Sequence, residues 1–232
     1  SLQACIDTDI PGSGVPQTLL RAVSGFGSVA IHHGLSFNFQ ENNTRPSSEV
    51  RLTFDNNLLG LVTTNVVNNQ LEVGLIQPIS SSEKRVDITG PTLTGITLTG
   101  DSTGQVDRLS GRQQLKLDLS GTSKLTIGHI EANHAEIAMV GKTQLSINGG
   151  AITSVVVSNA YSGAKIDAEN LTTQQMELTL SRGSVARVNV ARKLVVNLSE
   201  NSTVYYKGVP QIETLNMADN SRLIPIDLAP TR

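Results

Sequence analysis

The stretch Leu119-Ser-Gly-Thr-Ser123-Lys-Leu125 is the clearest copy of a motif that recurs through the second half of the chain. The motif has an apolar residue, three small or polar residues, a Ser or Thr, a spacer and a second apolar residue. Further copies begin at Met139, Leu180, Leu198 and Met217, and a weaker copy, with Ala in place of Ser or Thr, begins at Ala160. Successive copies are 18 to 21 residues apart. A fixed period of this length is typical of stacked architectures.

Apolar residues spaced by two lie on both sides of each motif, as with Leu117 and Leu119 before it and Leu125 and Ile127 after it. This alternation predicts a short strand on each side of a turn. A third, weaker apolar position follows at Ile130, Ile152, Leu171 and Val209. Such strands bury their apolar side chains only when units stack. The sequence therefore predicts an all-β fold, a right-handed parallel β-helix (β-solenoid) with coils of about 20 residues.

The chain divides into three regions. Residues 1–21 contain Pro and Gly without periodicity and predict a flexible leader or tether. Residues 22–90 alternate without repeating and predict an irregular N-terminal β region, either a cap or the first coils, with candidate strands at 28–31, 35–39, 50–54, 59–62, 70–76 and 86–88. Residues 91–232 are the repetitive solenoid, for which residues 225–230 are the candidate C-terminal cap.

The turn residues have a mechanical interpretation. Gly121 and Gly141 can adopt a positive φ at a tight corner. Ser123, Thr143 and their equivalents at 184, 202 and 221 would stack on one another, with hydroxyls bonding the neighbouring backbone. We therefore interpret the motif as structural and not as a ligand-binding ladder.

Composition excludes several functions. The net charge is −2, aromatic residues make up 3% and there is no Trp, so the chain lacks the basic clusters and stacking rings that bind nucleic acid. No stretch approaches the roughly 18 apolar residues of a transmembrane helix. The single cysteine, Cys5, leaves no internal disulfide and no multi-cysteine metal site.

Cys5 follows Leu2-Gln3-Ala4, which resembles the end of a bacterial lipoprotein signal. In such signals the cysteine is lipidated and becomes the mature N-terminus, which would anchor this chain to a membrane. The alternative is a free thiol near the start of the sequence.

Catalytic and metal-binding patterns are weak. The outward position between the paired apolar residues runs Asp118, Ala138, Thr179, Asn197 and Asn216, whereas polysaccharide-cleaving enzymes need several carboxylates together. His129 and His134 have Glu131 and Glu136 nearby, which we interpret as surface histidines and not as metal ligands. Nucleophile-elbow and nucleotide-binding patterns are missing from the sequence. The sequence thus predicts no catalytic, cofactor or metal residues.

Four segments, Gly163–Leu171, Met176–Leu180, Leu194–Ser199 and Val204–Pro210, resemble the bacterial "putative auto-transporter adhesin, head GIN domain" family. Its most distinctive local signature is matched by Tyr206, Gly208 and Pro210, and the resemblance covers roughly residues 22–226. Glu200 and Asp219 replace the Gly of the family's turn, which puts the corner geometry there in question. The resemblance implies a β-helix-like solenoid, export, and a family without an established activity.

We therefore expect an exported protein of the bacterial periplasm, outer membrane or cell surface. It would present a long flat surface to a glycan or envelope protein and perform no catalysis. Two alternatives stay open, a carbohydrate-active β-helix enzyme (polysaccharide lyase or hydrolase) and a structural envelope lipoprotein. An acidic cluster with raised pKa values would favour the enzyme, and an exposed strip of Asn, Thr and Ser would favour binding.

Overall fold

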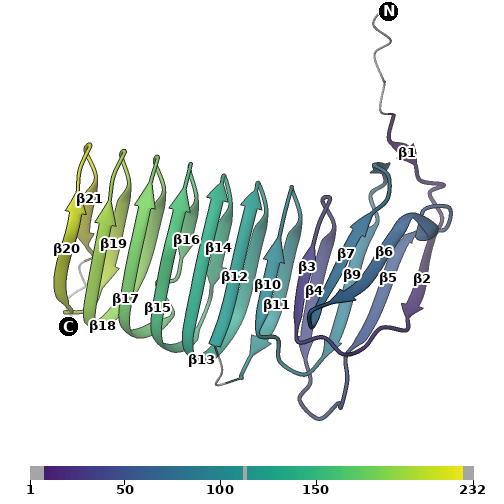
Figure 1. Cartoon of the computed structure of the whole chain (residues 1–232), viewed down its shortest axis with the longest axis horizontal. Coiled ribbons are helices and arrows are strands. Elements are labelled where there is room, and N and C mark those ends of the chain that lie inside the picture. The colour runs from purple at the N-terminus through teal and green to yellow at the C-terminus, as the bar shows by residue number, and fades with distance from the viewer. Residues whose placement is uncertain (1–7, 112–113, 227–232) are drawn as a thin grey trace, which may run out of the picture.

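The computed structural model describes residues 8–111 and 114–226 (Figure 1). The chain is 65% strand, with a parallel β-solenoid of about 6 turns over residues 95–225, which confirms the predicted β-solenoid. Within the described ranges the one helical element is a single 3-10 turn, η1 (Leu59–Leu61). No helix in this part of the chain is both long and apolar enough to cross a membrane.

The strands are β1 (Ile10–Pro11), β2 (Pro16–Arg21), β3 (Ser28–Ile31), β4 (Ser36–Glu41), β5 (Glu49–Asp55), β6 (Val62–Val67), β7 (Gln70–Leu75), β8 (Ile79–Ser80), β9 (Lys84–Gly90), β10 (Gly95–Leu98), β11 (Thr103–Leu109), β12 (Gln114–Gly121), β13 (Lys124–Gly141), β14 (Gln144–Ile147), β15 (Gly150–Tyr161), β16 (Lys165–Asp167), β17 (Thr172–Ser181), β18 (Val185–Leu198), β19 (Thr203–Lys207), β20 (Gln211–Met217) and β21 (Arg222–Pro225).

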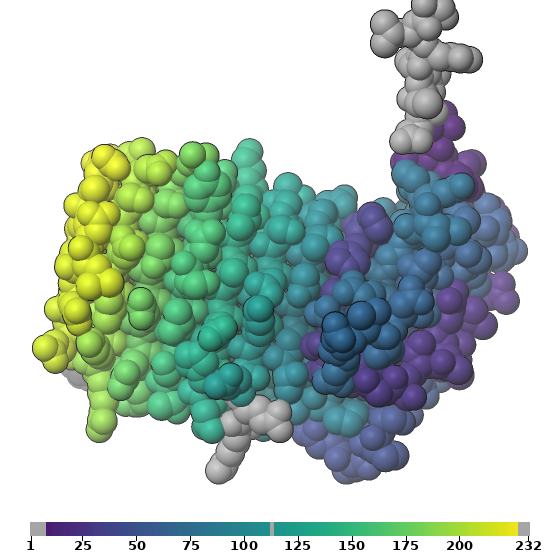
Figure 2. All heavy atoms as spheres, viewed as in Figure 1, coloured from purple at the N-terminus to yellow at the C-terminus, as the bar shows by residue number. Residues whose placement is uncertain are grey.

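Each coil of the solenoid has two long sides, which stack in parallel register on the coils before and after it. The first face consists of β10, β12, residues 134–141 of β13, β15, β17, residues 193–198 of β18 and β20. The second face consists of β11, residues 124–127 of β13, β14, β16, residues 185–189 of β18, β19 and β21. Figure 2 shows the coils as successive bands of colour along the molecule.

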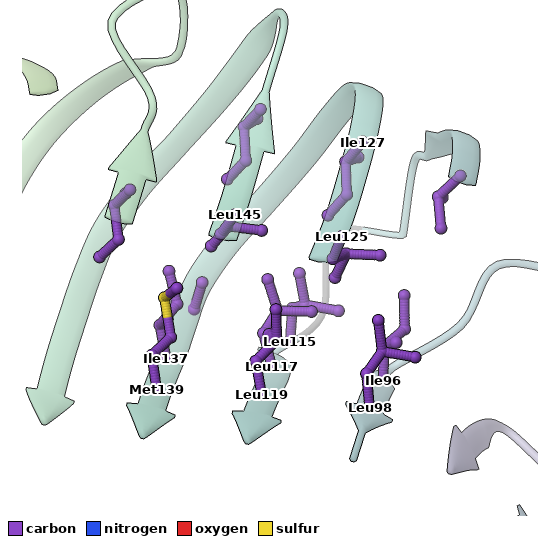
Figure 3. Packing of buried hydrophobic residues seen from close by; sticks show 14 of the residues in the cluster. Ile96, Leu98, Leu115, Leu117, Leu119, Leu125, Ile127, Ile137, Met139 and Leu145 are labelled. Carbon is purple, nitrogen blue, oxygen red and sulfur yellow. The ribbon is translucent and has the colours of Figure 1, made fainter. Parts of the chain in front are cut away.

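The core lies between the two faces. Leu98, Leu119 and Met139 stack in register on the first face, and Leu125 and Leu145 on the second. All five are buried, and side chains from both strands of a coil fill the space between them (Figure 3). Full burial of a side chain of this size contributes about 1.5–3 kcal/mol. The stack therefore supplies the apolar burial that no single coil could achieve.

The third apolar position is only partly as predicted. Ile130, Ile152 and Leu171 are buried, but Val209 is 94% exposed, so its predicted core position is wrong. In the strand register Lys207 lies opposite Asn189, which places Gly208 over Val190. A Cβ on Gly208 would clash with the Val190 carbonyl oxygen. Val209 is one residue further along and, because side chains alternate along the chain, it points outward.

Glycines at the corner between the two faces stack backbone against backbone. Gly100, Gly121 and Gly141 have φ of 64°, 74° and 90°. A Cβ on Gly121 would lie 2.5 Å from the carbonyl oxygen of Gly100, and a Cβ on Gly141 would lie 2.5 Å from that of Gly121. These corners therefore need Gly both for its positive φ and for its lack of a side chain.

The later corners solve the same problem with two consecutive left-handed residues. Glu200 and Asn201 have φ of 51° and 63°, and Asp219 and Asn220 have φ of 54° and 62°. Asn and Asp tolerate this region better than most residues. The departures from Gly at positions 200 and 219 thus keep a left-handed corner, which answers the question raised by the sequence.

The Ser and Thr of the repeat form a buried column beside the glycines. Ser123, Thr143, Ser184 and Ser202 are fully buried. The hydroxyl of Ser184 donates to the Ser181 carbonyl at 2.8 Å, and that of Ser202 donates to the Ser199 carbonyl at 2.7 Å. The Ser181 carbonyl also accepts the Ser184 N–H at 3.3 Å, so the hydroxyl adds a second bond at this corner.

The N-terminal region supplies two coils whose order in space differs from their order in sequence. Strands β3 and β4 stack on β10 and β11 and continue the solenoid stack toward the N-terminal end. Strands β7 and β9 stack on the other side of β3 and β4, although they come later in the chain (Figure 1). The region is therefore both the first coils and, through the strands described next, a cap.

The cap is antiparallel and corrects two predictions. Strand β5 pairs with β9, β6 with β7, and β2 with β5. Pro16–Arg21 lies in the predicted flexible leader, but its six residues pair with β5, so the leader prediction is wrong there. Residues 59–62 begin with η1 and not with a strand, because the Leu58 N–H bonds the Asp55 carbonyl and the Leu61 N–H bonds the Leu58 carbonyl. Four apolar residues are too few to distinguish the two structures by period.

The C-terminal end is open within the described residues. All residues of β20 are exposed, and Ile212, Leu215 and Met217 are 40%, 57% and 41% exposed. Nothing in 8–111 or 114–226 covers this coil, and residues 227–230 of the predicted cap lie outside the described residues.

Substitution of Gly121 by Ala tests the stacked corner. Gly183 has φ of 70° but open space around its Cβ position, so Gly183→Ala is a matched control that introduces backbone strain without a clash. We expect Gly183→Ala to lower the free energy of unfolding by about 1–2 kcal/mol, the cost of a left-handed L-residue. Gly121→Ala should cost clearly more, measured by urea unfolding. Equal losses would contradict the role of backbone contact.

Candidate functional site

The turn residues of the repeat line the core side of the corner and not a ligand site. Gly121, Ser123, Gly141 and Thr143 lie in the stacked columns described above. Tyr206 lies in β19, and Gly208 and Pro210 lie in the bend between β19 and β20. Cys5 lies outside the described residues.

Glu169 links three successive coils on the second face. Its Oε1 is 2.7 Å from Lys207 Nζ, and its Oε2 is 3.1 Å from Arg187 Nε. Hydrogen bonds from Lys207 and then Arg187 hold the pKa of the Glu169 carboxyl below its ordinary value. The Arg187 guanidinium also lies 5.1 Å from the centre of the Tyr205 ring. Two of the segments that carry the family resemblance, 163–171 and 204–210, therefore meet in space, and their contact clamps the coils together.

A column of small and neutral polar side chains runs along the outside of the first face. Register places Asp118 beside Ala138, Ala138 beside Asn159, and Thr179 beside Asn197. Asn216 follows beside Asn197. The sequence identified this column except for Asn159. β15 carries an extra residue, seen as register shifts against β13 and β17, and this bulge breaks the period-two spacing used to find the column.

The middle of this column has unused hydrogen-bonding capacity. The side chains of Asn159, Thr179 and Asn197 are half-buried and form no hydrogen bond to any other described residue. The Asn216 amide, in contrast, donates to the Leu198 carbonyl at 3.2 Å. We call Asn159, Thr179 and Asn197 the amide column.

A shallow groove of about 140 Å³ adjoins the amide column. Its outward residues on β15, β17 and β18 are Val156, Gln175, Glu177, Lys193 and Val195. The combination of an apolar floor with a few polar groups is typical of ligand-binding surfaces, although this groove is smaller than a small-molecule pocket.

A larger cleft of about 450 Å³ lies at the N-terminal end of the molecule. It gathers the ionisable side chains of Asp9, His33, Lys84 and Asp101 around Ile76, which is 62% exposed. The Leu75 N–H donates to His33 Nδ1 at 3.0 Å, so the neutral ring carries its proton on Nε2. Here the structure brings together ionisable residues that the sequence had not connected, because they come from segments far apart in the chain.

The two histidines considered as metal ligands lie in separate pairs. His129 Nε2 is 2.9 Å from Glu131 Oε1, and His134 Nε2 is 3.7 Å from Glu136 Oε1. Across residues 8–111 and 114–226, no group of three or more His, Cys, Asp or Glu side chains is placed to hold a metal ion.

Fold and surfaces together define a parallel β-solenoid protein with two long strand faces and a capped N-terminal end. Residues 25–210 match the family described as "putative auto-transporter adhesin, head GIN domain", and the chain belongs to this family. No curated protein sequence matches.

Solved structures share the fold at low sequence identity. A "putative adhesin" from Bacteroides fragilis has a TM-score of 0.85 and 17% identity, covering 94% of this chain and 100% of that one. A "putative lipid binding protein" from Parabacteroides distasonis has a TM-score of 0.77 and 14% identity, with 95% and 100% covered. A "putative adhesin" from Parabacteroides merdae has a TM-score of 0.72 and 15% identity, with 94% and 99% covered.

The Glu169 clamp predicts a pH-dependent contribution to stability. Because the folded-state pKa is lowered, the clamp stabilises the fold above the ordinary glutamate pKa of 4.5, and this is lost as pH falls through the lowered value. We expect Glu169→Gln to lower Tm at pH 7 by about 2–4 °C, the shift that about 1 kcal/mol produces at this chain length. As pH falls through the lowered pKa of Glu169, the two proteins should converge in Tm.

Glu213→Gln is the matched control, because Glu213 pairs with Lys193 at 3.0 Å but both side chains are about half exposed. Such pairs contribute little. A Tm difference for Glu169→Gln that persists unchanged at low pH would contradict the clamp.

Proposed function

We propose that this protein is an exported component of the bacterial cell envelope that binds an extended partner, a glycan chain or a protein, along its first face. The observation that carries the proposal is the amide column. Asn159, Thr179 and Asn197 present unused donors and acceptors on successive coils, about 4.8 Å apart.

The setting of the column favours binding over a purely structural role. The side chains are neutral and partly exposed, so a partner would displace water from them at small cost. They project from a sheet whose register is held by the core, and a preorganised site loses little entropy on binding. The repeat of the column along the solenoid suits an extended ligand better than a compact one.

The compartment forms part of the same proposal. Membership of an adhesin-named family and similarity to proteins named as adhesins support a location in the periplasm, the outer membrane or the cell surface. The alternative function, which requires no binding partner, is that of a structural lipoprotein of the envelope.

Removal of the amide column should weaken binding and leave the fold intact. We expect the double substitution Asn159→Ala, Asn197→Ala to reduce affinity by about tenfold or more, since each lost hydrogen bond contributes about 1 kcal/mol. The measurement is titration of the glycan or envelope protein that the wild type selects from a glycan array and an envelope-protein panel.

Asn148→Ala is the control, because Asn148 is an exposed Asn at the end of β14. It should leave affinity unchanged. Equal binding by the double variant and the wild type would rule out the amide column as the site.

The N-terminal cleft is where an enzymatic alternative would reside, because it brings Asp9, His33 and Asp101 together. The proposal of a non-catalytic protein requires polysaccharides to keep their chain length on incubation with the wild type. Cleavage that is abolished by Asp101→Asn would instead favour the enzyme.

Lipidation of Cys5 would attach the protein to a membrane. We expect Cys5→Ser to move the protein from the membrane fraction to the soluble fraction of cells that express it with its signal. Unchanged membrane association of Cys5→Ser would contradict the lipid anchor but would leave the proposal for the amide column intact.

A further inference from the structure

Two lysines lie on the second face, and a third lies at the corner beside them on the coil between. Gln144 pairs with Lys124 on one side and with Lys165 on the other, so these two lysines are two strand spacings apart, about 10 Å. Lys142 lies on the coil between them, with its side chain over Gly163, whose Cβ position is 3.7 Å from Lys142 Cγ. We call Lys124, Lys142 and Lys165 the lysine strip.

The charge of the lysine strip is not neutralised by any residue that the structure describes. Its three side chains are exposed and form no ion pair within the described residues. Other lysines of the solenoid do have partners: Lys116 is 3.9 Å from Asp118, and Lys207 is 2.7 Å from Glu169. Like charges on neighbouring coils repel one another, and this repulsion lowers the stability of the fold. An anionic ligand would remove the repulsion.

The two faces differ in the charge that they present. The outward positions of the second face from β13 to β21 carry the cations Lys124, Lys165, Arg187, Lys207 and Arg222 and the anions Asp167 and Glu169. Those of the first face from β12 to β20 carry the cations Lys116 and Lys193 and the anions Asp118, Glu136, Glu177 and Glu213. A polyanion would therefore be attracted to the second face.

A groove of about 480 Å³ lies against the lysine strip on the same face. It crosses β14, β16 and β18, and its polar residues are Gln144, Ser146, Lys165, Asp167 and Arg187. Asp167 stands between Ser146 and Arg187 in register, in the middle of the groove. The groove thus combines cations with groups that can accept or donate hydrogen bonds.

We propose that the lysine strip and this groove bind an acidic polysaccharide. Ammonium groups on alternate coils would meet carboxylate or sulfate groups spaced along the chain. Gln144, Ser146 and Asp167 would bond its hydroxyls. An anionic membrane is the other partner suggested by lysines, but the site is concave, and Asp167 at its centre would repel a lipid phosphate while it can accept a bond from a sugar hydroxyl.

This site lies on the opposite side of the core from the amide column and does not rest on the function proposed there. Loss of the amide column leaves the second face unchanged, and loss of the lysine strip leaves the first face unchanged. The two proposals therefore fail separately.

The test is titration of the full chain with polygalacturonate and with dextran sulfate, with neutral dextran as the uncharged probe. We expect the wild type to bind both acidic polymers and not dextran, with affinity that falls between 50 and 200 mM salt as ionic contacts are screened. Lys124→Gln, Lys165→Gln should weaken binding to polygalacturonate at least about tenfold at 50 mM salt.

The matched control is Lys116→Gln, Lys193→Gln, which removes the same charge from the first face and should change affinity less than about twofold. Circular dichroism and Tm check that both double variants fold. Equal losses in the two variants would reveal non-specific charge attraction and overturn the proposal. The proposal would also be overturned if the wild type did not bind acidic polymers. This holds even if the wild type binds phosphatidylglycerol vesicles and the binding depends on the lysine strip.

Discussion

Every feature of this molecule depends on the corner between the two faces. At each corner the chain must reverse within four residues and still keep its strands about 4.8 Å from the coils before and after. Gly100, Gly121 and Gly141 achieve this by placing backbone directly on backbone, and later corners achieve it with paired left-handed residues such as Glu200 and Asn201. The buried hydroxyls of Ser184 and Ser202 then add hydrogen bonds to carbonyls of the same corner. With these corners in place, the apolar columns of neighbouring coils stay aligned.

Exact stacking of the coils also decides what the surface can do. An outward residue in one coil lies beside its equivalent in the next. A residue type that recurs at this position therefore forms a column along the surface. Neutral amides accumulate in this way on the first face, at Asn159 and Asn197. Lysines without an ion pair to any described residue accumulate on the second face, at Lys124 and Lys165. A solenoid therefore offers two extended surfaces of different chemistry, held apart by one core.

The two ends of the stack differ in how their strands are covered. At the N-terminal end β5 and β6 pair in antiparallel fashion with β9 and β7 and cover their edges, and β2 pairs in turn with β5. In this arrangement the chain passes from β3 and β4 to the outer side of the stack, where β7 and β9 pair with them. At the other end β20 leaves Ile212 and Leu215 exposed in the last described coil. Edge strands of this kind are normally blunted by prolines or charges, and Pro225 in β21 is one such feature.

The sequence by itself determined the repeat, the alternation and therefore the β-solenoid, because the apolar residues at positions such as Leu117 and Leu119 recur with a period that only stacked strands can bury. It also located the corner glycines and the buried hydroxyls, because these requirements are local to four residues. Only the tertiary structure decided the rest. The non-sequential order of the first coils, the pairing of Pro16–Arg21 with β5, the outward turn of Val209, and the place of Asn159 in its column depend on which distant strand lies alongside. The same holds for the Glu169 clamp and the lysine strip, since charges from different coils become neighbours only when the register between coils is set.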